Sequence, residues 1–278
     1  MNNFLEFYQY LPYRINPEIF HIGQYFFGWY AFMYLAGFST VYLLLRKRLI
    51  LGESKISEEQ LLDILIFCFI GAIIGGRLGY VFFYNPAYYL ANPLVIVSPF
   101  DLSSGKLIGI RGMSYHGGLV GALVCGLVFA KKNKLDFWQI TDFIFPAIPA
   151  GYFFGRIGNF LNGELYGRIT DKWWGMYFPG DVLQVLRYPS QLYEAFLEGF
   201  LLFIFFWKIR NSANFKGKIL AWYLMSYSTM RFVGEFFRQP DAQIGLLVGG
   251  LSMGQILSLV MFFCGVVILF WRKRKDIV

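Results

Sequence analysis

Long apolar runs recur from one end of the chain to the other, and they restrict the possible folds more than any other feature. Of the 278 residues, 57% are hydrophobic and only 15% are charged, whereas a soluble domain carries about 25% charged residues. Several of the runs approach the roughly 20 apolar residues that cross a bilayer as a helix. The sequence therefore predicts an all-α integral membrane protein that crosses the bilayer several times.

Seven of these runs are expected to form transmembrane helices. They cover residues 24–45, 61–84, 113–130, 138–160, 190–208, 217–237 and 252–271. The longer loops, 85–112, 161–189 and 238–251, all fall on one face, and such loops commonly carry function. We expect a single polytopic domain over residues 1–278, with an N-terminal interfacial arm and a small outer segment. The arm covers residues 1–23 and the outer segment residues 161–189.

The net charge of +8 is distributed unevenly between the two ends of these spans. Fifteen of the 25 lysines and arginines fall in four clusters that follow or join alternate spans, at 46–55, 131–134, 208–218 and 272–275. Because basic residues favour the cytoplasmic side, we expect the N-terminus outside and the C-terminus in the cytoplasm. The basic charge thus reports topology, and nothing in it indicates nucleic acid as a partner.

The cysteines and histidines argue against a metal site. Cys68, Cys125 and Cys264 each fall within a predicted span and have no CxxC spacing, which favours small apolar packing residues. Only His21 and His116 could assist a metal or a cysteine nucleophile. We therefore expect no metal and no cofactor.

Charged side chains in or near the outer halves of the predicted spans are functional candidates, because ionisable groups are costly in a bilayer. They are Arg77, Arg156, Arg231 and Glu235. Arg231 and Glu235 are one turn apart on one helical face. Tyr227 precedes this pair by one turn, and Arg238 follows it.

Two interpretations of the arginines are open. Three glutamates elsewhere in the chain can neutralise them through space, which would make the set a structural ion network. These are Glu164, Glu194 and Glu198. Alternatively, several guanidinium groups near the outer leaflet suit an anionic phosphate, which they bind through a planar fork of donors. At that depth the abundant anionic molecule is a phospholipid.

The stretch GRIGNFLNGELYG, residues 155–167, brings unusual polarity to the end of an apolar run. Asn159 and Asn162 can add neutral hydrogen bonds to glycerol hydroxyls. Its glycines would let backbone N–H groups approach a headgroup. They are Gly155, Gly158, Gly163 and Gly167.

Two further positions fit proton transfer. His116, in GMSYHGGLVG, begins the third span, and imidazole has a reference pKa of about 6.5, which suits a base at neutral pH. A lone histidine is more often a hydrogen-bonded interfacial residue. Tyr30 and Tyr34 share a helical face and can bring a phenol to the same level, or serve as an interfacial and a packing residue.

Together these residues resemble the phosphatidylglycerol–prolipoprotein diacylglyceryl transferase family of bacterial inner membranes. The resemblance covers nearly the whole chain, through GWYAFMYLAGF, GGRLGYVFFYN, MSYHGGLVG, GRIGNFLNGELYGR, PSQLYEAFLEG, RFVGEFFRQPDAQIG and SMGQILS. Gly28 departs from the family pattern, since relatives often have a histidine there. The resemblance implies seven spans with the site facing the periplasm or outer surface.

The resemblance also implies an activity. Such enzymes transfer diacylglyceryl from phosphatidylglycerol to the lipobox cysteine thiol of a preprolipoprotein, forming a thioether and releasing glycerol phosphate. Matched by motif, the functional residues fall on Tyr30, His116, Arg156, Asn159, Glu164, Gly167, Arg231 and Glu235. His116 would then accept the thiol proton, with Tyr30 as the next candidate. Arg156 and Arg231 would stabilise the departing phosphate.

Two other classes of function stay open. A phospholipid or organophosphate transporter could use the same arginines, together with a weak GRxG echo between residues 75–85 and 154–164. Against it, the sequence predicts few helix breaks at the membrane midplane, and its polarity gathers on one face. A structural scaffold for other membrane proteins would not need His116.

Overall fold

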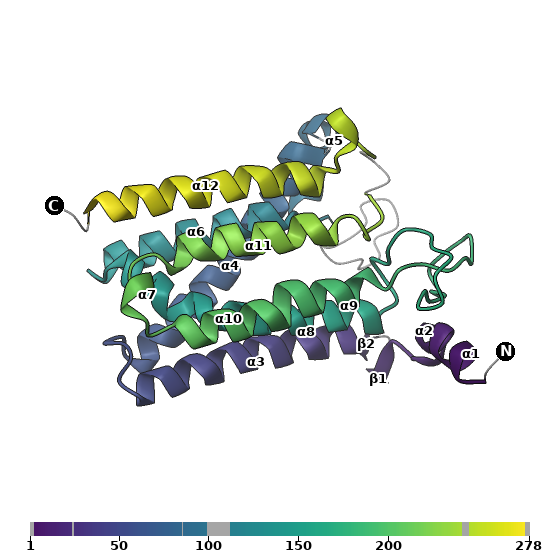
Figure 1. Ribbon diagram of the computed structural model, residues 1–278, viewed down its shortest axis with the longest axis horizontal. Coiled ribbons are helices and arrows are strands. Elements are labelled where there is room, and N and C mark those ends of the chain that lie inside the picture. Colours follow the sequence, from purple (N-terminus) through teal and green to yellow (C-terminus); the bar gives the residue numbers. More distant parts are fainter. Residues whose placement is uncertain (1–2, 24, 85, 99–111, 241–244, 276–278) are drawn as a thin grey trace. The chain divides into compact units, whose positions relative to one another are not determined.

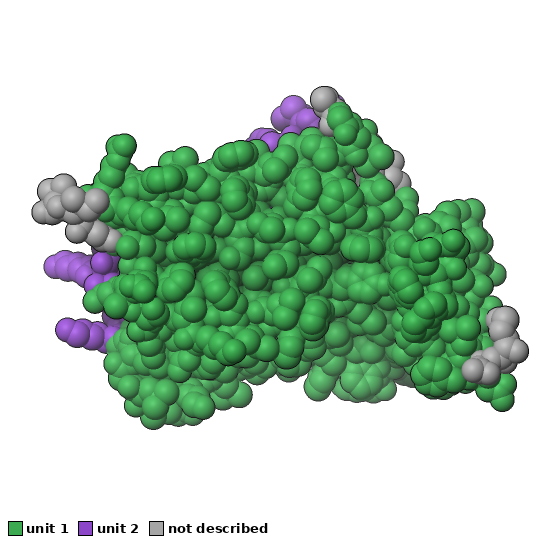
Figure 2. All heavy atoms as spheres, in the orientation of Figure 1, with its two compact units in different colours: residues 1–54, 141–278 green, residues 55–140 purple. Residues whose placement is uncertain are grey.

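The computed structural model describes residues 3–23, 25–84, 86–98, 112–240 and 245–275. These residues form two compact units, which Figure 2 colours separately. The first unit comprises residues 1–54 and 141–278, and the second comprises residues 55–140. Each unit is described by itself below.

The first unit is mostly helical and holds most of the long helices in Figure 1. Its α-helices are α1 (Asn3–Gln9), α2 (Leu11–Arg14), α3 (Trp29–Ile50), α8 (Ile148–Leu161), α9 (Ser190–Glu194), α10 (Leu202–Ile209), α11 (Ile219–Gly234) and α12 (Met253–Lys275). Short helical turns are η2 (Phe145–Ala147), η4 (Ala213–Phe215) and η5 (Val248–Gly250). Helix α3 packs against α8, and α11 packs against α12.

The second unit is built on two helices that approach each other closely. It contains α4 (Glu58–Tyr84), α5 (Pro86–Ala91), η1 (Pro93–Ile96) and α6 (Tyr115–Lys132), and α7 (Phe137–Ile144) leads from it into the first unit. Gly75 and Gly79 of α4 face Gly117 and Gly121 of α6, and a Cβ atom at Gly79 would lie only 2.9 Å from the Gly117 Cα. Glycines at this spacing let the two backbones pack together.

Helix occupies most of each of the seven ranges expected to cross the membrane. Among the described residues, two helices are long and apolar enough by themselves to span a bilayer, over Glu58–Phe83 and Met253–Arg274. Crossing by all seven and the orientation of the termini remain predictions.

The expectation of an all-helical chain is wrong at the start of the first span. Strands β1 (Glu18–Ile22) and β2 (Tyr25–Gly28) form an antiparallel hairpin. Helix α3 therefore begins at Trp29 and not at residue 24, after Gly28 in an extended conformation (φ −103°, ψ 164°). Aromatic and β-branched residues suit strands, so this aromatic run pairs with its neighbour before the helix starts.

Two of the expected spans contain an irregular helical segment. The expectation of few helix breaks at the membrane midplane stays a prediction. The run from α7 to α8 is interrupted at η2, where Pro146 lacks the backbone N–H that an α-helix needs. Between α9 and α10 lies the π-helix η3 (Ala195–Leu201). Such segments are frequent at functional sites, and this one carries Glu198 one turn after Glu194.

The N-terminal arm docks on the outer segment of the same unit. The Tyr8 hydroxyl donates to the Trp174 carbonyl at 3.0 Å, and the Gln9 amide donates to the Trp173 carbonyl at 3.1 Å. In return, the Tyr177 backbone N–H donates to the Gln9 carbonyl at 2.8 Å. These bonds fix α1 to the loop between α8 and α9.

A buried ion pair stabilises that outer segment from within. The Arg187 guanidinium donates two hydrogen bonds of 2.8 Å to the Asp181 carboxylate, the forked geometry that suits this pair. The carboxylate also accepts the backbone N–H groups of Leu183 and Val185. The Arg187 hydrogen bonds lower the pKa of the Asp181 carboxyl below its usual value, with support from these two N–H groups.

Candidate active site

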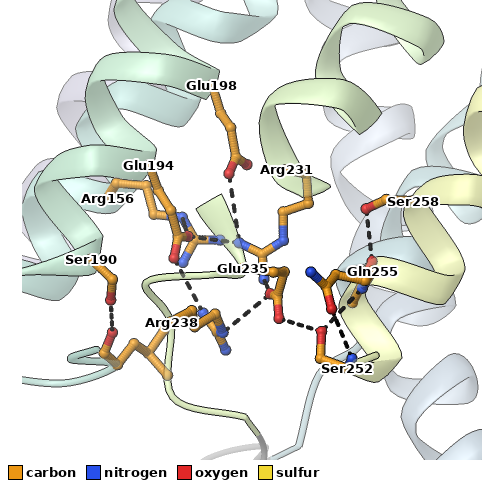
Figure 3. A network of polar contacts seen from close by, with 12 residues as sticks. Arg156, Ser190, Glu194, Glu198, Arg231, Glu235, Arg238, Ser252, Gln255 and Ser258 are labelled. Carbon is orange, nitrogen blue, oxygen red and sulfur yellow. Dashed lines mark hydrogen bonds and ion pairs between the residues drawn. The ribbon is translucent and has the colours of Figure 1, made fainter. Parts of the chain in front are cut away.

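A network of charged side chains joins α8, α9, η3, α11 and the start of α12 in the first unit (Figure 3). Its centre contains three arginines and three glutamates, Arg156, Arg231, Arg238, Glu194, Glu198 and Glu235. The formal charges cancel, which is the condition for keeping so many ionisable groups out of water.

Glu194 is the hub of this network. Its side chain is 1% exposed and lies 2.8 Å from Arg231 Nη1 and 3.0 Å from Arg156 Nε. Arg238 Nη1 lies farther away, 3.7 Å from Glu194 Oε1. The expectation that Glu194 can neutralise Arg156 through space is therefore confirmed.

The expected pairing of Arg231 with Glu235 on one face of α11 is also confirmed, because Arg231 Nη2 donates to Glu235 Oε1. The other Glu235 oxygen accepts the Ser252 hydroxyl at 2.7 Å. A Cβ atom at Gly254 would lie 2.6 Å from the Glu235 carboxyl carbon, so this glycine admits the carboxylate to the start of α12. A negative group is favourable at that helix end.

Arg156 is held on two of its three nitrogens. Its Nε donates to the Tyr152 hydroxyl at 2.8 Å and pairs with Glu194, while Nη1 donates to Asn159 Oδ1 at 3.3 Å. The guanidinium also lies over the Tyr152 ring, 4.9 Å from its centroid. Within the described part of the chain, Nη2 makes no hydrogen bond, so this edge of the guanidinium remains available to a ligand.

The polar stretch after Arg156 is tied into the same network. Asn159 Nδ2 donates to Glu164 Oε1 at 2.8 Å, and the Glu164 backbone carbonyl accepts from Gln191 Nε2 at 2.6 Å. Asn162 is exposed and ends α8 through its backbone N–H, which donates to the Gly158 carbonyl. A direct contact of either asparagine with substrate remains a prediction.

Gly167 lets two segments pass close together. Its N–H donates to the Tyr188 carbonyl at 2.8 Å, and a Cβ atom there would lie 2.7 Å from the same oxygen. The expected approach of this N–H to a headgroup therefore has a competing partner inside the protein.

Two tyrosine sites border the network. Tyr227 is 1% exposed and packs edge-to-face on Tyr152, with ring centroids 5.7 Å apart. Tyr30 and Tyr34 share a face of α3 as expected, since the Tyr30 hydroxyl donates to that of Tyr34 at 3.1 Å. Tyr30 also lies against Gly158 of α8.

Arg77 and His116 belong to the second unit. Arg77 donates to the carbonyls of Val95 at 2.6 Å and Ile96 at 2.8 Å, so it orders the turn after α5. His116 lies in the first turn of α6, where the Ser114 side chain caps the helix by accepting the Gly117 N–H. Participation of Arg77 and His116 in the site of the first unit remains a prediction.

Sequence reasoning missed four polar residues of the network, although two of them had a local signal. Ser252 and Gln255 have the Ser-x-x-Gln spacing of a capping box. The Ser252 N–H donates to Gln255 Oε1 at 3.0 Å, and the Gln255 N–H donates to Ser252 Oγ at 3.1 Å. The contacts of Tyr152 with Glu198 and of Gln191 with Glu164 had no comparable signal, because these partners lie far apart along the chain.

An apolar groove of about 420 Å³ lies beside the network. Its lining residues are Trp174, Tyr193, Phe196, Leu197 and Phe237. Two of them directly precede Glu194 and Arg238 in the sequence. The groove thus places a hydrocarbon-compatible surface next to the charged groups.

The described residues contain no group of three or more His, Cys, Asp or Glu side chains arranged to hold a metal ion. Cys68 and Cys125 are half-buried free thiols, and Cys264 is an exposed one. The network itself is built from arginine–carboxylate pairs, amides and hydroxyls.

Comparison with known proteins gives the family. Residues 17–271 match the family described as prolipoprotein diacylglyceryl transferase. A phosphatidylglycerol–prolipoprotein diacylglyceryl transferase of Chlorobaculum tepidum is 43% identical over 99% of this chain and 96% of the relative. Proteins of the same name are 47% identical in Bordetella parapertussis, over 91% and 93% of the two chains, and 44% identical in Wolinella succinogenes, over 97% of each. The chain therefore belongs to the prolipoprotein diacylglyceryl transferase family.

Proposed function

We propose that this protein is a membrane transferase that moves diacylglyceryl from phosphatidylglycerol to the lipobox cysteine thiol of preprolipoproteins. Relatives with this activity in their name match nearly the whole chain. The observation that carries the proposal is the uncommitted Nη2 edge of Arg156 inside a buried, charge-balanced network. Neither a transporter nor a scaffold finds support among these relatives.

The reaction is a displacement at the glyceryl carbon that bears the phosphate. The cysteine sulfur forms a bond to this carbon, and the carbon–oxygen bond to phosphate breaks. The thiol proton passes to a base, the peptide gains a thioether, and glycerol phosphate leaves. Because a cysteine thiol has a pKa of about 8.5, a base near neutrality accelerates the attack.

The arginines stabilise the charge that develops on the departing phosphate. Arg156 offers Nη2, and Arg238 lies 3.7 Å from Glu194 and 3.6 Å from Glu235. Arg156 and Arg238 both pair with Glu194, so a phosphate beside this carboxylate can take donors from the two arginines. Arg231, whose two terminal nitrogens are already paired, keeps Glu194 and Glu235 in place.

His116 is the proposed base. His116 lies in the first turn of α6, and imidazole is the side chain that most often serves as a general base. Tyr30 is the next candidate, and its hydroxyl is oriented by Tyr34.

The proposed setting is a bacterial inner membrane. A single polytopic domain crosses it seven times, with the N-terminus outside, the C-terminus in the cytoplasm and the site facing the periplasm or outer surface. The helices in all seven ranges and the four basic clusters support this arrangement. The bilayer then supplies phosphatidylglycerol and presents the preprolipoprotein signal peptide.

A direct assay tests the function. Purified protein is mixed with phosphatidylglycerol micelles and a lipobox peptide, and mass spectrometry follows the peptide. We expect a mass gain of one diacylglyceryl group, and none on a peptide whose lipobox cysteine is replaced by serine. Folded protein that yields no lipidated peptide, but moves labelled phospholipid across vesicles, would establish the transporter instead.

A further inference from the structure

Two buried glutamines of the network each leave one amide atom without a hydrogen bond among the described residues. Gln255 is 2% exposed and Gln191 is fully buried. The two atoms are Gln255 Nε2 and Gln191 Oε1. Because buried polar atoms are nearly always hydrogen-bonded, each atom indicates a partner other than the residues that the structure describes.

The existing bonds fix which amide atom is left over. Gln255 Oε1 accepts the Ser252 N–H at 3.0 Å, so turning the amide over would set two donors against each other. Gln191 Nε2 donates to the Glu164 carbonyl at 2.6 Å, so turning this amide would oppose two acceptors. The unused atom is therefore a donor at Gln255 and an acceptor at Gln191.

The unused donor belongs to the same chain of polar contacts as Arg231. Gln255 is joined to Glu235 through the Ser252 hydroxyl, which donates to Glu235 at 2.7 Å. In Figure 3 the amide nitrogen of Gln255 is turned to the side of Arg231. A phosphate drawn to these guanidinium groups would find one more neutral donor there.

The unused acceptor belongs to a row of acceptors. Gln191, Glu194 and Glu198 follow one another at helical spacing along α9 and η3. One carboxylate oxygen of Glu194 and one of Glu198 also lack a hydrogen bond within the described residues, and each has only an ion pair of 3.7 Å. An ionised phosphate diester has no hydrogen to donate to such a row, whereas the hydroxyls of a glycerol headgroup do.

We infer that Gln191 and Gln255 bind the headgroup of the substrate phospholipid, an inference that rests on the proposed transferase function. Gln191 Oε1 accepts a hydrogen bond from a glycerol hydroxyl, and Gln255 Nε2 donates to a phosphate oxygen. Gln191 is then a specificity residue, because a buried acceptor built for a hydroxyl disfavours a lipid without one. Gln255 binds any phospholipid with an accessible phosphate.

Lipid binding without peptide substrate tests the two roles separately. The affinities of wild-type protein, Gln191→Met and Gln255→Met are measured for phosphatidylglycerol and for phosphatidylmethanol, a phosphate diester without a headgroup hydroxyl, from ligand-induced shifts in thermal unfolding in detergent. We expect Gln191→Met to weaken phosphatidylglycerol binding about tenfold and to leave phosphatidylmethanol binding unchanged. Gln255→Met should weaken binding of both lipids about tenfold.

The chain offers a matched control for the capping role of Gln255. Ser57 and Gln60 form a second capping box at the start of α4, with hydrogen bonds of 3.0 and 3.1 Å. Gln60→Met removes this cap outside the network, so it should lower thermal stability as Gln255→Met does and leave lipid affinity unchanged. If Gln255→Met fails to fold, Gln255→Glu keeps the capping acceptor, loses the donor and should bind both lipids at least tenfold more weakly.

The outcomes distinguish failure of this inference from failure of the proposed transferase function. Wild-type lipid affinity in both methionine variants would overturn the inference, and product formation by the wild-type enzyme would still uphold the transferase. Equal weakening of both lipids by Gln191→Met would overturn the assignment of the hydroxyl to Gln191. No lipidated peptide from folded wild-type protein would remove the transferase function itself.

Discussion

The charge of Arg156 and the planar shape of its guanidinium group serve different contacts. Glu194 neutralises the charge, whereas the planar fork reaches Tyr152 and Asn159 and still presents Nη2. A lysine at this position can satisfy the carboxylate, but its compact ammonium cannot present the planar fork of donors that suits a bidentate contact to phosphate. Substitution of Arg156 therefore tests whether the network recognises phosphate or only balances charge.

We expect Arg156→Lys to lower kcat/KM by about 10²–10³-fold, the usual loss when a preorganised donor to a developing anion is removed. The measurement is peptide lipidation by purified protein. Arg14→Lys is the control, since Arg14 lies over Phe7 in the N-terminal arm and should keep full activity. Turnover near that of the wild type in Arg156→Lys would mean that charge alone is needed.

His116→Gln separates base catalysis from a structural role. Glutamine forms hydrogen bonds but does not titrate, so we expect phosphatidylglycerol binding to persist and the rate at neutral pH to fall about 10²–10⁴-fold. Raising the pH towards 8.5, the approximate pKa of a thiol, should restore part of the rate because thiolate then forms unaided. The measurement is turnover against pH for both proteins. A rate loss that pH does not relieve would assign His116 a structural role, and full activity would leave Tyr30 as the next candidate.

Spacing along the sequence predicted the residue contacts within one helix but few contacts between helices. The Arg231–Glu235 pair follows from one turn of α11. The central position of Glu194 does not follow from spacing, because Glu164 and Glu198 were equally possible partners. Only the packing of α8, α9 and α11 selects Glu194. The contact of Gln191 with Glu164 was hidden for the same reason.

At the level of elements, the α4–α6 contact depends on the absence of side chains. We expect Gly75→Ala to destabilise the protein by about 1–3 kcal/mol, the usual cost of overpacking, because the new Cβ atom would lie 2.8 Å from the Gly121 Cα. Gly155→Ala is the control within another helix, where no atom lies within 4 Å of the added Cβ. There alanine should stabilise the helix by about 0.5–1 kcal/mol. Unfolding in detergent measures both, and equal effects would rule out the close contact.

The outer segment should depend on pH through Asp181. Its pKa is lowered by Arg187, so the ion pair contributes stability above the unfolded pKa of about 3.9 and loses it as pH falls through the folded value. We expect Asp181→Asn to loosen the segment at neutral pH and to abolish much of its further loosening in acid. Proteolysis between residues 162 and 189 at several pH values measures this. Asp171→Asn is the control, since the Asp171 side chain is 88% exposed, and an identical response in both variants would exclude the buried pair.

The helices were largely predictable because a helix that is buried or faces lipid has a long run of apolar residues. The hairpin at residues 18–28 was not, since an aromatic run suits a strand or the start of a helix equally well. The π-helix η3 was not predicted for a different reason. The composition of a helix does not show which backbone hydrogen bonds it forms.

For the whole molecule, the charge pattern predicts that Lys132 and Arg274 face the cytoplasm and that Lys106 and Lys172 face outward. Lys106 lies outside the described residues. Single cysteines at these four positions, in a variant lacking the natural cysteines, are treated with a membrane-impermeant thiol reagent. We expect labelling of intact cells at 106 and 172 only. Labelling of position 132 from outside would reverse the orientation and move the site to the other face.

The docking of the N-terminal arm has a consequence for biosynthesis. Gln9 leaves the ribosome early, but its partner Trp173 is 164 residues away and is translated much later. Throughout that interval the arm has none of its final hydrogen bonds to the outer segment. Helices that fold during that interval therefore fold without this contact, and docking of the arm becomes a late step in the maturation of the protein.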